Sequence, residues 1–178
     1  MLVSLEDIAG DVRLGLWSFS KAEGLSVRDC ERKAVNSLLA AMLNSSSFKI
    51  EHTASGKPYV KGYNISISHT CGYVAVILSS KCQVGVDIEY QSDRVDRIAS
   101  RFMRTDEVAD TTVKRLINWC AKETVYKLFS EENLTYQQMH VIIDSNSYAF
   151  VNNLKSNTSV LVYYRITSGY VLTYSFIE

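Results

Sequence analysis

At residues 84–89 the chain reads Val84-Gly85-Val86-Asp87-Ile88-Glu89. The period of two predicts a β-strand whose apolar face carries the valines and the isoleucine, and whose other face carries Asp87 and Glu89. Two carboxylates on one strand face repel each other, and two interpretations are open. They are ordinary acids on a solvent-facing edge, or they are ligands for a hard cation such as Mg²⁺, which prefers oxygen ligands and commonly takes one or two carboxylates.

A second group of polar residues lies further along, where residues 119–127 read Trp119-Cys120-Ala121-Lys122-Glu123-Thr124-Val125-Tyr126-Lys127. The segment is expected inside a helix, so Glu123 and Lys127, four positions apart, share one helix face. They form either a surface ion pair, or a third carboxylate for a metal together with a lysine that meets phosphate charge. Neither group of residues is specific by itself.

The chain before residue 84 predicts strands and one helix. Residues 12–16 alternate as a strand, and an apolar stripe with i, i+3, i+4, i+7 spacing then predicts an amphipathic helix. The stripe consists of Val35, Leu38, Leu39, Met42 and Leu43. Ser26 or Asp29 is expected to cap the start of this helix, and Asn44 to end it. Further strands are expected at residues 48–52, 64–69 and 73–78, with glycine-containing turns between them.

The chain after residue 89 shows a helical pattern from residue 93 to about residue 129, followed by strands at 139–143, 160–166 and 170–177. Both halves therefore run strand, helix and β-meander. This order predicts an α+β fold and is compatible with a structural repeat that leaves no clear sequence repeat. We place the division between an N-terminal half, residues 1–82, and a C-terminal half, residues 83–178.

Composition limits the class of protein. The chain has 178 residues and equal numbers of acidic and basic side chains, so its total charge gives no reason to expect binding to nucleic acid or to a membrane surface. The first eleven residues do not read as a secretory signal, and no apolar run is long enough for a membrane span. Four widely spaced cysteines without a CxxC pair argue against a zinc or redox motif. We expect a cytoplasmic protein with reduced, mostly buried thiols.

Taken together, residues 84–89 and residues 119–127 resemble the paired signature of the 4′-phosphopantetheinyl transferase superfamily. That signature is a (V/I)G(V/I)D strand followed, a few tens of residues later, by an aromatic-x-x-K-E-x-x-x-K helix. Both parts are present in order, and Asp87 and Glu123 lie 36 positions apart.

Other segments resemble the branch of the family that activates surfactin synthetase and other peptide synthetases. Gly56-Lys57-Pro58 matches its GKP motif, and Ile67-Ser68-His69-Thr70 matches its N-(I/L)-S-H-S motif. Arg101-Phe102 is similar to the start of its R-F-F-x-x-x-E-Y segment, and Asp29-Cys30-Glu31-Arg32 to its D-x-x-R helix start. The resemblance covers roughly residues 29 to 143. It departs from the branch at the N-terminus, where a basic helix is replaced by a segment with only Lys21 and Arg28.

The resemblance implies an enzyme that moves the 4′-phosphopantetheine arm of coenzyme A onto a serine of an acyl or peptidyl carrier protein. It implies two similar α+β halves related by a pseudo-twofold axis, with the active site in the cleft between them. Two such fused halves complete the site within one chain, so we expect a monomer. The partners would be coenzyme A and the carrier protein.

The resemblance also implies roles for particular residues. Asp87, Glu89 and Glu123 would hold Mg²⁺ against the pyrophosphate of coenzyme A, and Glu123 and Lys127 would be catalytic. Glu123 would take the serine proton, directly or through water, and Lys127 would contact the pyrophosphate. The nucleotide end and its phosphates would be contacted by Arg32, Lys57, Ser68 and His69.

Two alternatives share the same carboxylates. One is a module that binds coenzyme A and Mg²⁺ without transferring the arm, and the other is a Mg²⁺-dependent phosphohydrolase. For docking of an acidic carrier protein, the segment after the 84–89 strand offers Arg94, Arg97, Arg101 and Arg104. If this segment is helical, the spacing puts all four arginines on one face, as a basic ridge beside the carboxylates.

Overall fold

The computed structural model describes residues 1–178 as an α+β fold with two antiparallel sheets and three helices. The N-terminal sheet has the strand order β1-β2-β6-β5-β4-β3. Its strands are β1 (Leu2–Ala9), β2 (Val12–Ser18), β3 (Ile50–His52), β4 (Pro58–Val60), β5 (Tyr63–Thr70) and β6 (Tyr73–Ser79). The C-terminal sheet has the order β7-β11-β10-β9-β8. Its strands are β7 (Gln83–Tyr90), β8 (Met139–Ile143), β9 (Tyr148–Asn153), β10 (Thr158–Ile166) and β11 (Tyr170–Ile177).

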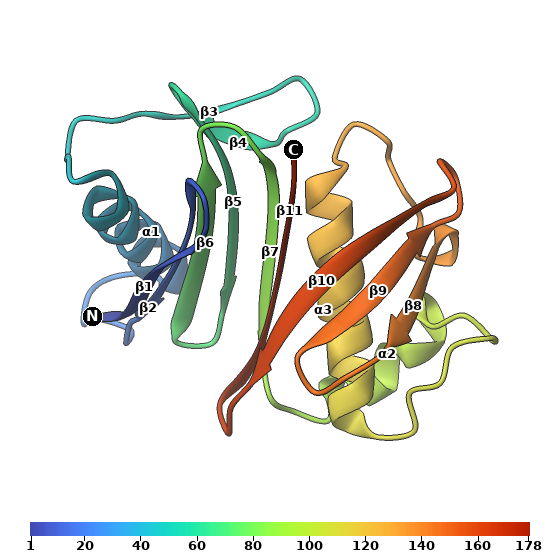
Figure 1. Ribbon diagram of the computed structural model, residues 1–178. Coiled ribbons are helices and arrows are strands. Elements are labelled where there is room, and N and C mark those ends of the chain that lie inside the picture. The colour runs from blue at the N-terminus through green and yellow to red at the C-terminus, as the bar shows by residue number, and fades with distance from the viewer.

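The helices lie on the outer sides of the two sheets (Figure 1). Helix α1 (Val27–Leu43) packs on β2 and β6, and helix α3 (Thr112–Leu128) packs on β7 and β11. Helix α2 (Arg94–Phe102) packs beside α3, and a short 3₁₀ helix, η1 (Tyr136–Gln138), precedes β8. The order of layers is thus α1, N-terminal sheet, C-terminal sheet and α3.

One apolar cluster joins the two sheets. It combines side chains of β2 and β6 with the apolar face of β7 and two residues of β11. The β7 side chains are Val84, Val86 and Ile88, and all three are fully buried. The alternation seen in the sequence therefore reflects a strand whose apolar face meets the opposite sheet and whose other face meets α3.

Gly85 permits the close approach of α3 to β7. A Cβ atom at this position would lie 2.3 Å from the backbone oxygen of Thr124 and 3.3 Å from the Leu128 side chain. No side chain fits in that space, since real Cβ contacts are not this short. Gly85 therefore brings the α3 backbone, and with it Glu123 and Lys127, close to the carboxylate face of β7.

Hydroxyl side chains of β5 hold the edge of β7. Beyond its short pairing with β4, strand β5 meets β7 without a backbone ladder between them. The Ser66 hydroxyl accepts the Val86 N–H at 3.1 Å, and the Thr70 hydroxyl accepts the Tyr90 N–H at 3.0 Å. These bonds satisfy two edge donors that β11, on the other side of β7, does not reach. Alternate polar residues of β5 thus replace the missing ladder.

Most predicted elements are confirmed. The Ser26 side chain caps α1 by accepting the Asp29 N–H at 3.1 Å, and Asn44 ends the helix in the left-handed conformation. Three of the four cysteines are buried and none forms a disulfide, as expected. No helix combines the length and the apolar composition that a membrane crossing needs.

One prediction about the elements is wrong. The segment 93–129 is not one helical stretch, because Met103 leaves α2 in an extended conformation and the Thr111 side chain caps a new helix. Arg104 therefore lies outside α2 and does not share its basic face. Three strands were also not predicted: β1, an irregular edge strand with two register shifts, β4, which begins at Pro58, and β9, which ends in two asparagines.

Candidate active site

Asp87 is at the centre of the candidate site. Asp87 is only 4 % exposed, so the interpretation of Asp87 as a solvent-facing acid is wrong. The Ser68 hydroxyl and the Lys127 ammonium both donate to Oδ1 of Asp87, each at 2.7 Å. Oδ2 is buried and accepts no hydrogen bond from an N–H or O–H group, and the Cys120 thiol of α3 lies close to the carboxylate, whose charge helps to raise the Cys120 pKa. A buried charged oxygen without a partner is costly, and it marks the position where a ligand would be stabilised most.

Lys127 reaches across from α3 to β7. Its ammonium also donates to the Val86 carbonyl oxygen at 3.0 Å. It forms its ion pair with Asp87, whereas no ion pair joins it to Glu123 on its own helix. The interpretation of Glu123 and Lys127 as a surface ion pair is therefore also wrong, because the lysine belongs to the carboxylate cluster.

Glu89 lies two residues along β7 on the same strand face. The Thr70 hydroxyl donates to its Oε2 at 3.2 Å. Burial raises the pKa of Glu89, and the negative charge of Asp87 raises it further. A raised pKa means that the ionised carboxylate is poorly stabilised, so a cation at this point would relieve an electrostatic cost.

Glu123 approaches from α3. The Tyr136 hydroxyl donates to its Oε1 at 2.8 Å. Burial raises the pKa of Glu123, and the charge of Asp87 adds to the rise, while the bond from Tyr136 opposes it. The charge of Asp87 therefore raises the pKa of two other carboxylates, that of Glu89 on β7 and that of Glu123 on α3.

The three carboxylates suit Mg²⁺ chemically. No three histidine, cysteine or acidic side chains are grouped closely enough to hold a metal ion by themselves. Mg²⁺ does not require such a cage, because it usually keeps several waters and binds one or two protein carboxylates together with substrate phosphates. The partnerless Oδ2 of Asp87 and the raised pKa values of Glu89 and Glu123 fit such a site.

Lys57 lies in a pocket next to the carboxylates. The pocket is lined by both lysines of the candidate site, Lys57 and Lys127, and by small hydroxyl residues, Ser55, Ser66 and Ser130. The Lys57 ammonium donates to Gln83 Oε1 at 2.8 Å and to the Leu128 carbonyl oxygen at 3.2 Å. Burial lowers the pKa of Lys57. The lining thus combines two lysine side chains with three serine hydroxyls, and the two ammonium groups themselves bond to Gln83 and Leu128 and to Val86 and Asp87.

His69 and Arg32 are separate from the carboxylates. His69 alternates with Ser68 along β5, so its side chain lies on the other face, where Nδ1 is 3.2 Å from Oε1 of Glu31. Arg32 is 64 % exposed and lies 4.0 Å from Asp29. No hydrogen bond or ion pair joins either residue to Asp87, Glu89, Glu123 or Lys127.

Sequence reasoning missed two hydroxyl groups that orient the carboxylates, those of Thr70 and Tyr136. Thr70 could have been found, since it continues the alternation of Ser66 and Ser68 along one strand face. Tyr136 had no signal in the sequence, because it follows α3 by several residues and reaches Glu123 only through the fold.

The comparison with protein families gives one match. The profile described as the 4′-phosphopantetheinyl transferase superfamily matches residues 83–175, just over half of the chain. The matched region starts with β7 and includes Asp87, Glu89, Glu123 and Lys127. No individual curated protein matches the chain. The carboxylates of β7 and α3 thus lie within the part of the sequence that the family shares, and this chain belongs to the 4′-phosphopantetheinyl transferase superfamily.

Proposed function

We propose that this protein transfers the 4′-phosphopantetheine arm of coenzyme A to a serine of an acyl or peptidyl carrier protein and releases adenosine 3′,5′-bisphosphate. The observation that carries the proposal is the buried Asp87, with Lys127 on one carboxylate oxygen and no partner on the other, in the family-matched region. Asp87, Glu89 and Glu123 would hold Mg²⁺, which when bound supplies positive charge beside the pyrophosphate.

The reaction joins the serine Oγ to the β-phosphorus of coenzyme A and breaks the bond from that phosphorus to the bridging oxygen of the pyrophosphate. Negative charge then grows on the leaving phosphate. The Lys127 ammonium meets this charge, since positioning and electrostatic stabilisation are the main contributions to phosphoryl transfer. Glu123 takes the serine proton, directly or through water. Its raised pKa supports this role, because a carboxylate with a pKa nearer to neutral pH is a stronger base.

The pocket that contains Lys57 and Lys127 receives the phosphates of coenzyme A. The support is the two lysine side chains and three serines in its lining, together with the contact between Lys127 and Asp87; in this role the Lys57 ammonium would exchange its contacts with Gln83 and Leu128 for a phosphate. Ser68 serves the site by holding Asp87. We assign His69 and Arg32 to the nucleotide end, at a distance from the carboxylates. In that role His69 would exchange its contact with Glu31 for a phosphate.

We also propose that the fold consists of two related halves, residues 1–82 and 83–178. Two observations support this division. The chain passes from the N-terminal sheet to the C-terminal sheet between Ser79 and Gln83. The strand orders β2-β6-β5-β4-β3 and β7-β11-β10-β9-β8 also correspond, because in each the strand that precedes the helix lies next to the last strand of the meander. The Lys57 pocket takes lining residues from both halves, as a cleft between them would. Since one chain supplies the whole site, we propose a monomer.

Incubation with coenzyme A and Mg²⁺, with and without an apo carrier protein, tests the proposed function. Mass spectrometry of the carrier and chromatography of coenzyme A are the two measurements. Transfer adds a phosphopantetheine group to the carrier and releases adenosine 3′,5′-bisphosphate only when the carrier is present. Consumption of coenzyme A without a carrier would instead indicate a phosphohydrolase. Binding of coenzyme A without any product would indicate a module that has no transfer activity.

A further inference from the structure

Tyr136 and Glu123 form a contact that the family signature does not include. The Tyr136 hydroxyl donates to Oε1 of Glu123 at 2.8 Å. Tyr136 is the first residue of η1, which a capping box of Thr135 and Gln138 stabilises. The tyrosine ring lies 5.3 Å from the ring of Trp119, which in turn packs on Phe102 at 5.1 Å. The ring is therefore fixed by apolar packing, and only its hydroxyl reaches the carboxylate cluster.

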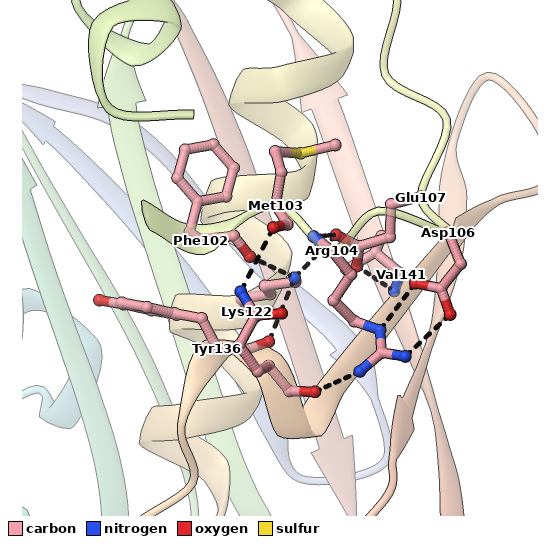
Figure 2. Close-up of polar contacts among 9 residues, drawn as sticks. Phe102, Met103, Arg104, Asp106, Glu107, Lys122, Tyr136 and Val141 are labelled. Carbon is pink, nitrogen blue, oxygen red and sulfur yellow. Dashed lines mark hydrogen bonds and ion pairs between the residues drawn. The ribbon is translucent and has the colours of Figure 1, made fainter. Parts of the chain in front are cut away.

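The backbone of Tyr136 is held by a buried lysine. The Lys122 ammonium donates to three acceptors: the Phe102 carbonyl oxygen at 2.7 Å, Glu107 Oε2 at 2.8 Å and the Tyr136 carbonyl oxygen at 3.2 Å. Figure 2 shows this ammonium between the three oxygens. Both Lys122 and Glu107 have side chains that are 0 % exposed. All three N–H donors of the ammonium are satisfied, so the buried charge fixes the elements around it.

Glu107 extends the same network. Its Oε1 accepts the Val141 N–H of β8 at 2.7 Å, and its Oε2 accepts the Arg104 N–H at 2.8 Å (Figure 2). The Arg104 guanidinium binds the Asp106 carboxylate through two bonds of 2.8 Å and also donates to the Gln137 carbonyl oxygen of η1. These bonds join the segment before α3, which carries Arg104 and Glu107, to η1 and β8, which follow α3. Since Lys122 precedes Glu123, the pair anchors Tyr136 to the very turn of α3 that carries Glu123.

We propose that Tyr136 is a positioning residue: its hydroxyl holds one oxygen of Glu123 and so leaves the other oxygen for the serine proton. The Lys122–Glu107 pair holds Tyr136 in place for this purpose. A carboxylate that is free to rotate would present its second oxygen correctly only part of the time, and the cost would fall on turnover. This inference rests on the proposed function.

The test uses Tyr136→Phe in the full chain, with coenzyme A, Mg²⁺ and an apo carrier. This change keeps the ring that packs on Trp119 and removes only the hydroxyl. Tyr164→Phe is the matched control, because Tyr164 belongs to the apolar cluster against which the partly buried Tyr136 packs, and its hydroxyl donates to a backbone oxygen, that of Ser145. For Tyr136→Phe we expect kcat to fall roughly tenfold, with the KM values for coenzyme A and carrier within about twofold of the wild type. Tyr164→Phe should keep the wild-type kcat, even if its melting temperature falls as much as that of Tyr136→Phe.

A double-mutant cycle separates positioning from a general structural effect. If the hydroxyl acts through Glu123, then Tyr136→Phe should cause no further loss of kcat in a Glu123→Gln background. Full kcat in Tyr136→Phe, or an equal loss in the Glu123→Gln background, would overturn the inference and leave the proposed function intact. Failure of the wild-type protein to label any apo carrier would overturn the proposed function, and the inference with it.

Discussion

The Lys127 ammonium and the Ser68 hydroxyl share a single oxygen of Asp87, Oδ1, and leave Oδ2 without a partner in a buried position. Asp87 can therefore bind a cation through Oδ2 while it keeps its lysine. In the proposed function, a lysine that the Asp87 carboxylate already orients would need little reorganisation when substrate arrives. The ion pair between Asp87 and Lys127 thus joins the two parts of the sequence signature, the β7 strand and the α3 helix.

The first prediction concerns pH and Mg²⁺. Mg²⁺ binds ionised carboxylates, and burial raises the pKa of both Glu89 and Glu123 above the ordinary glutamate value of 4.5. A raised folded-state pKa means that the metal-free folded protein holds these protons more tightly than the unfolded chain does. Metal-free stability at these two sites therefore increases as pH falls through the folded pKa values, whereas Mg²⁺ must displace the protons.

The increase in melting temperature caused by Mg²⁺ should accordingly be small at acid pH and grow as pH rises through the raised pKa values. Thermal unfolding with and without Mg²⁺, over a pH range that begins below the ordinary glutamate value of 4.5 and ends above neutral pH, measures this difference. In Glu123→Gln the Mg²⁺-induced increase in melting temperature should depend less on pH, since one of the two glutamates that must lose a proton is gone. A Mg²⁺ effect that is independent of pH over this range would argue against these two ligands.

The second prediction concerns Gly85. A methyl group here would collide with the Thr124 backbone oxygen, so Gly85→Ala should push α3 away from β7. We expect the free energy of unfolding to fall by roughly 1–3 kcal/mol or more, as for other overpacked positions, and transfer to fall with it because Glu123 and Lys127 move. Chemical denaturation provides the measurement. The control is Gly169→Ala, where a Cβ would meet no atom closer than 3.6 Å. Equal stability of the two variants would refute the close-approach explanation.

The third prediction separates Lys57 from His69. Lys57 shares a pocket with Lys127, so Lys57→Ala should raise the KM for coenzyme A by roughly tenfold and leave the KM for the carrier unchanged. His69 is 52 % exposed and pairs with Glu31, so His69→Ala should raise the coenzyme A KM less. Both variants are compared on coenzyme A and on dephospho-coenzyme A. If either residue binds the 3′-phosphate, its effect should disappear with dephospho-coenzyme A, and an effect that persists would exclude that contact.

The fourth prediction concerns the carrier. Of the four arginines expected to form a ridge, Arg104 binds Asp106 instead, and Arg94 lies close enough to affect the pKa of Glu89. Arg97 and Arg101 are exposed on α2, where Arg97 also forms an exposed ion pair with Asp93 at 3.2 Å. Charge reversal there, in Arg97→Glu with Arg101→Glu, should raise the KM for an acidic carrier by roughly tenfold at low salt and less at moderate salt. Coenzyme A binding should not change. Lys61→Glu with Lys81→Glu, which makes the same change in net charge at exposed positions outside α2, is the control, and an equal effect of both double variants would show that only net charge matters.

The sequence predicted this fold well where the period of its apolar residues reflects burial. The α1 stripe and the β7 alternation are examples, since each has one face in an apolar cluster. It failed where a tertiary contact overrides the local pattern. The boundary between α2 and α3 depends on the loop that carries Glu107. That loop is held by Lys122, which lies 15 residues further along the chain, inside α3.

The candidate site shows the same limit. Period-two alternation placed Asp87 and Glu89 on one face, and the family signature added Glu123 and Lys127. Local spacing suggested a pair between Glu123 and Lys127, but the structure pairs Lys127 with Asp87 and Glu123 with Tyr136. These partners come from other elements. Only the packing of α3 on β7, permitted by Gly85, and the placement of η1 bring them together.

The central claim is that transfer depends on the charge of the Asp87 carboxylate, whose Oδ2 is the proposed metal ligand, and the intact mass of an apo carrier protein tests it most directly. The carrier is incubated with coenzyme A, Mg²⁺ and either the wild-type protein or Asp87→Asn, which keeps the shape of the side chain but removes its charge. The account predicts that the wild type adds one phosphopantetheine group and that Asp87→Asn, still folded and still binding coenzyme A, is slower by about a hundredfold or more. Near-normal labelling by Asp87→Asn at saturating Mg²⁺ would contradict the account.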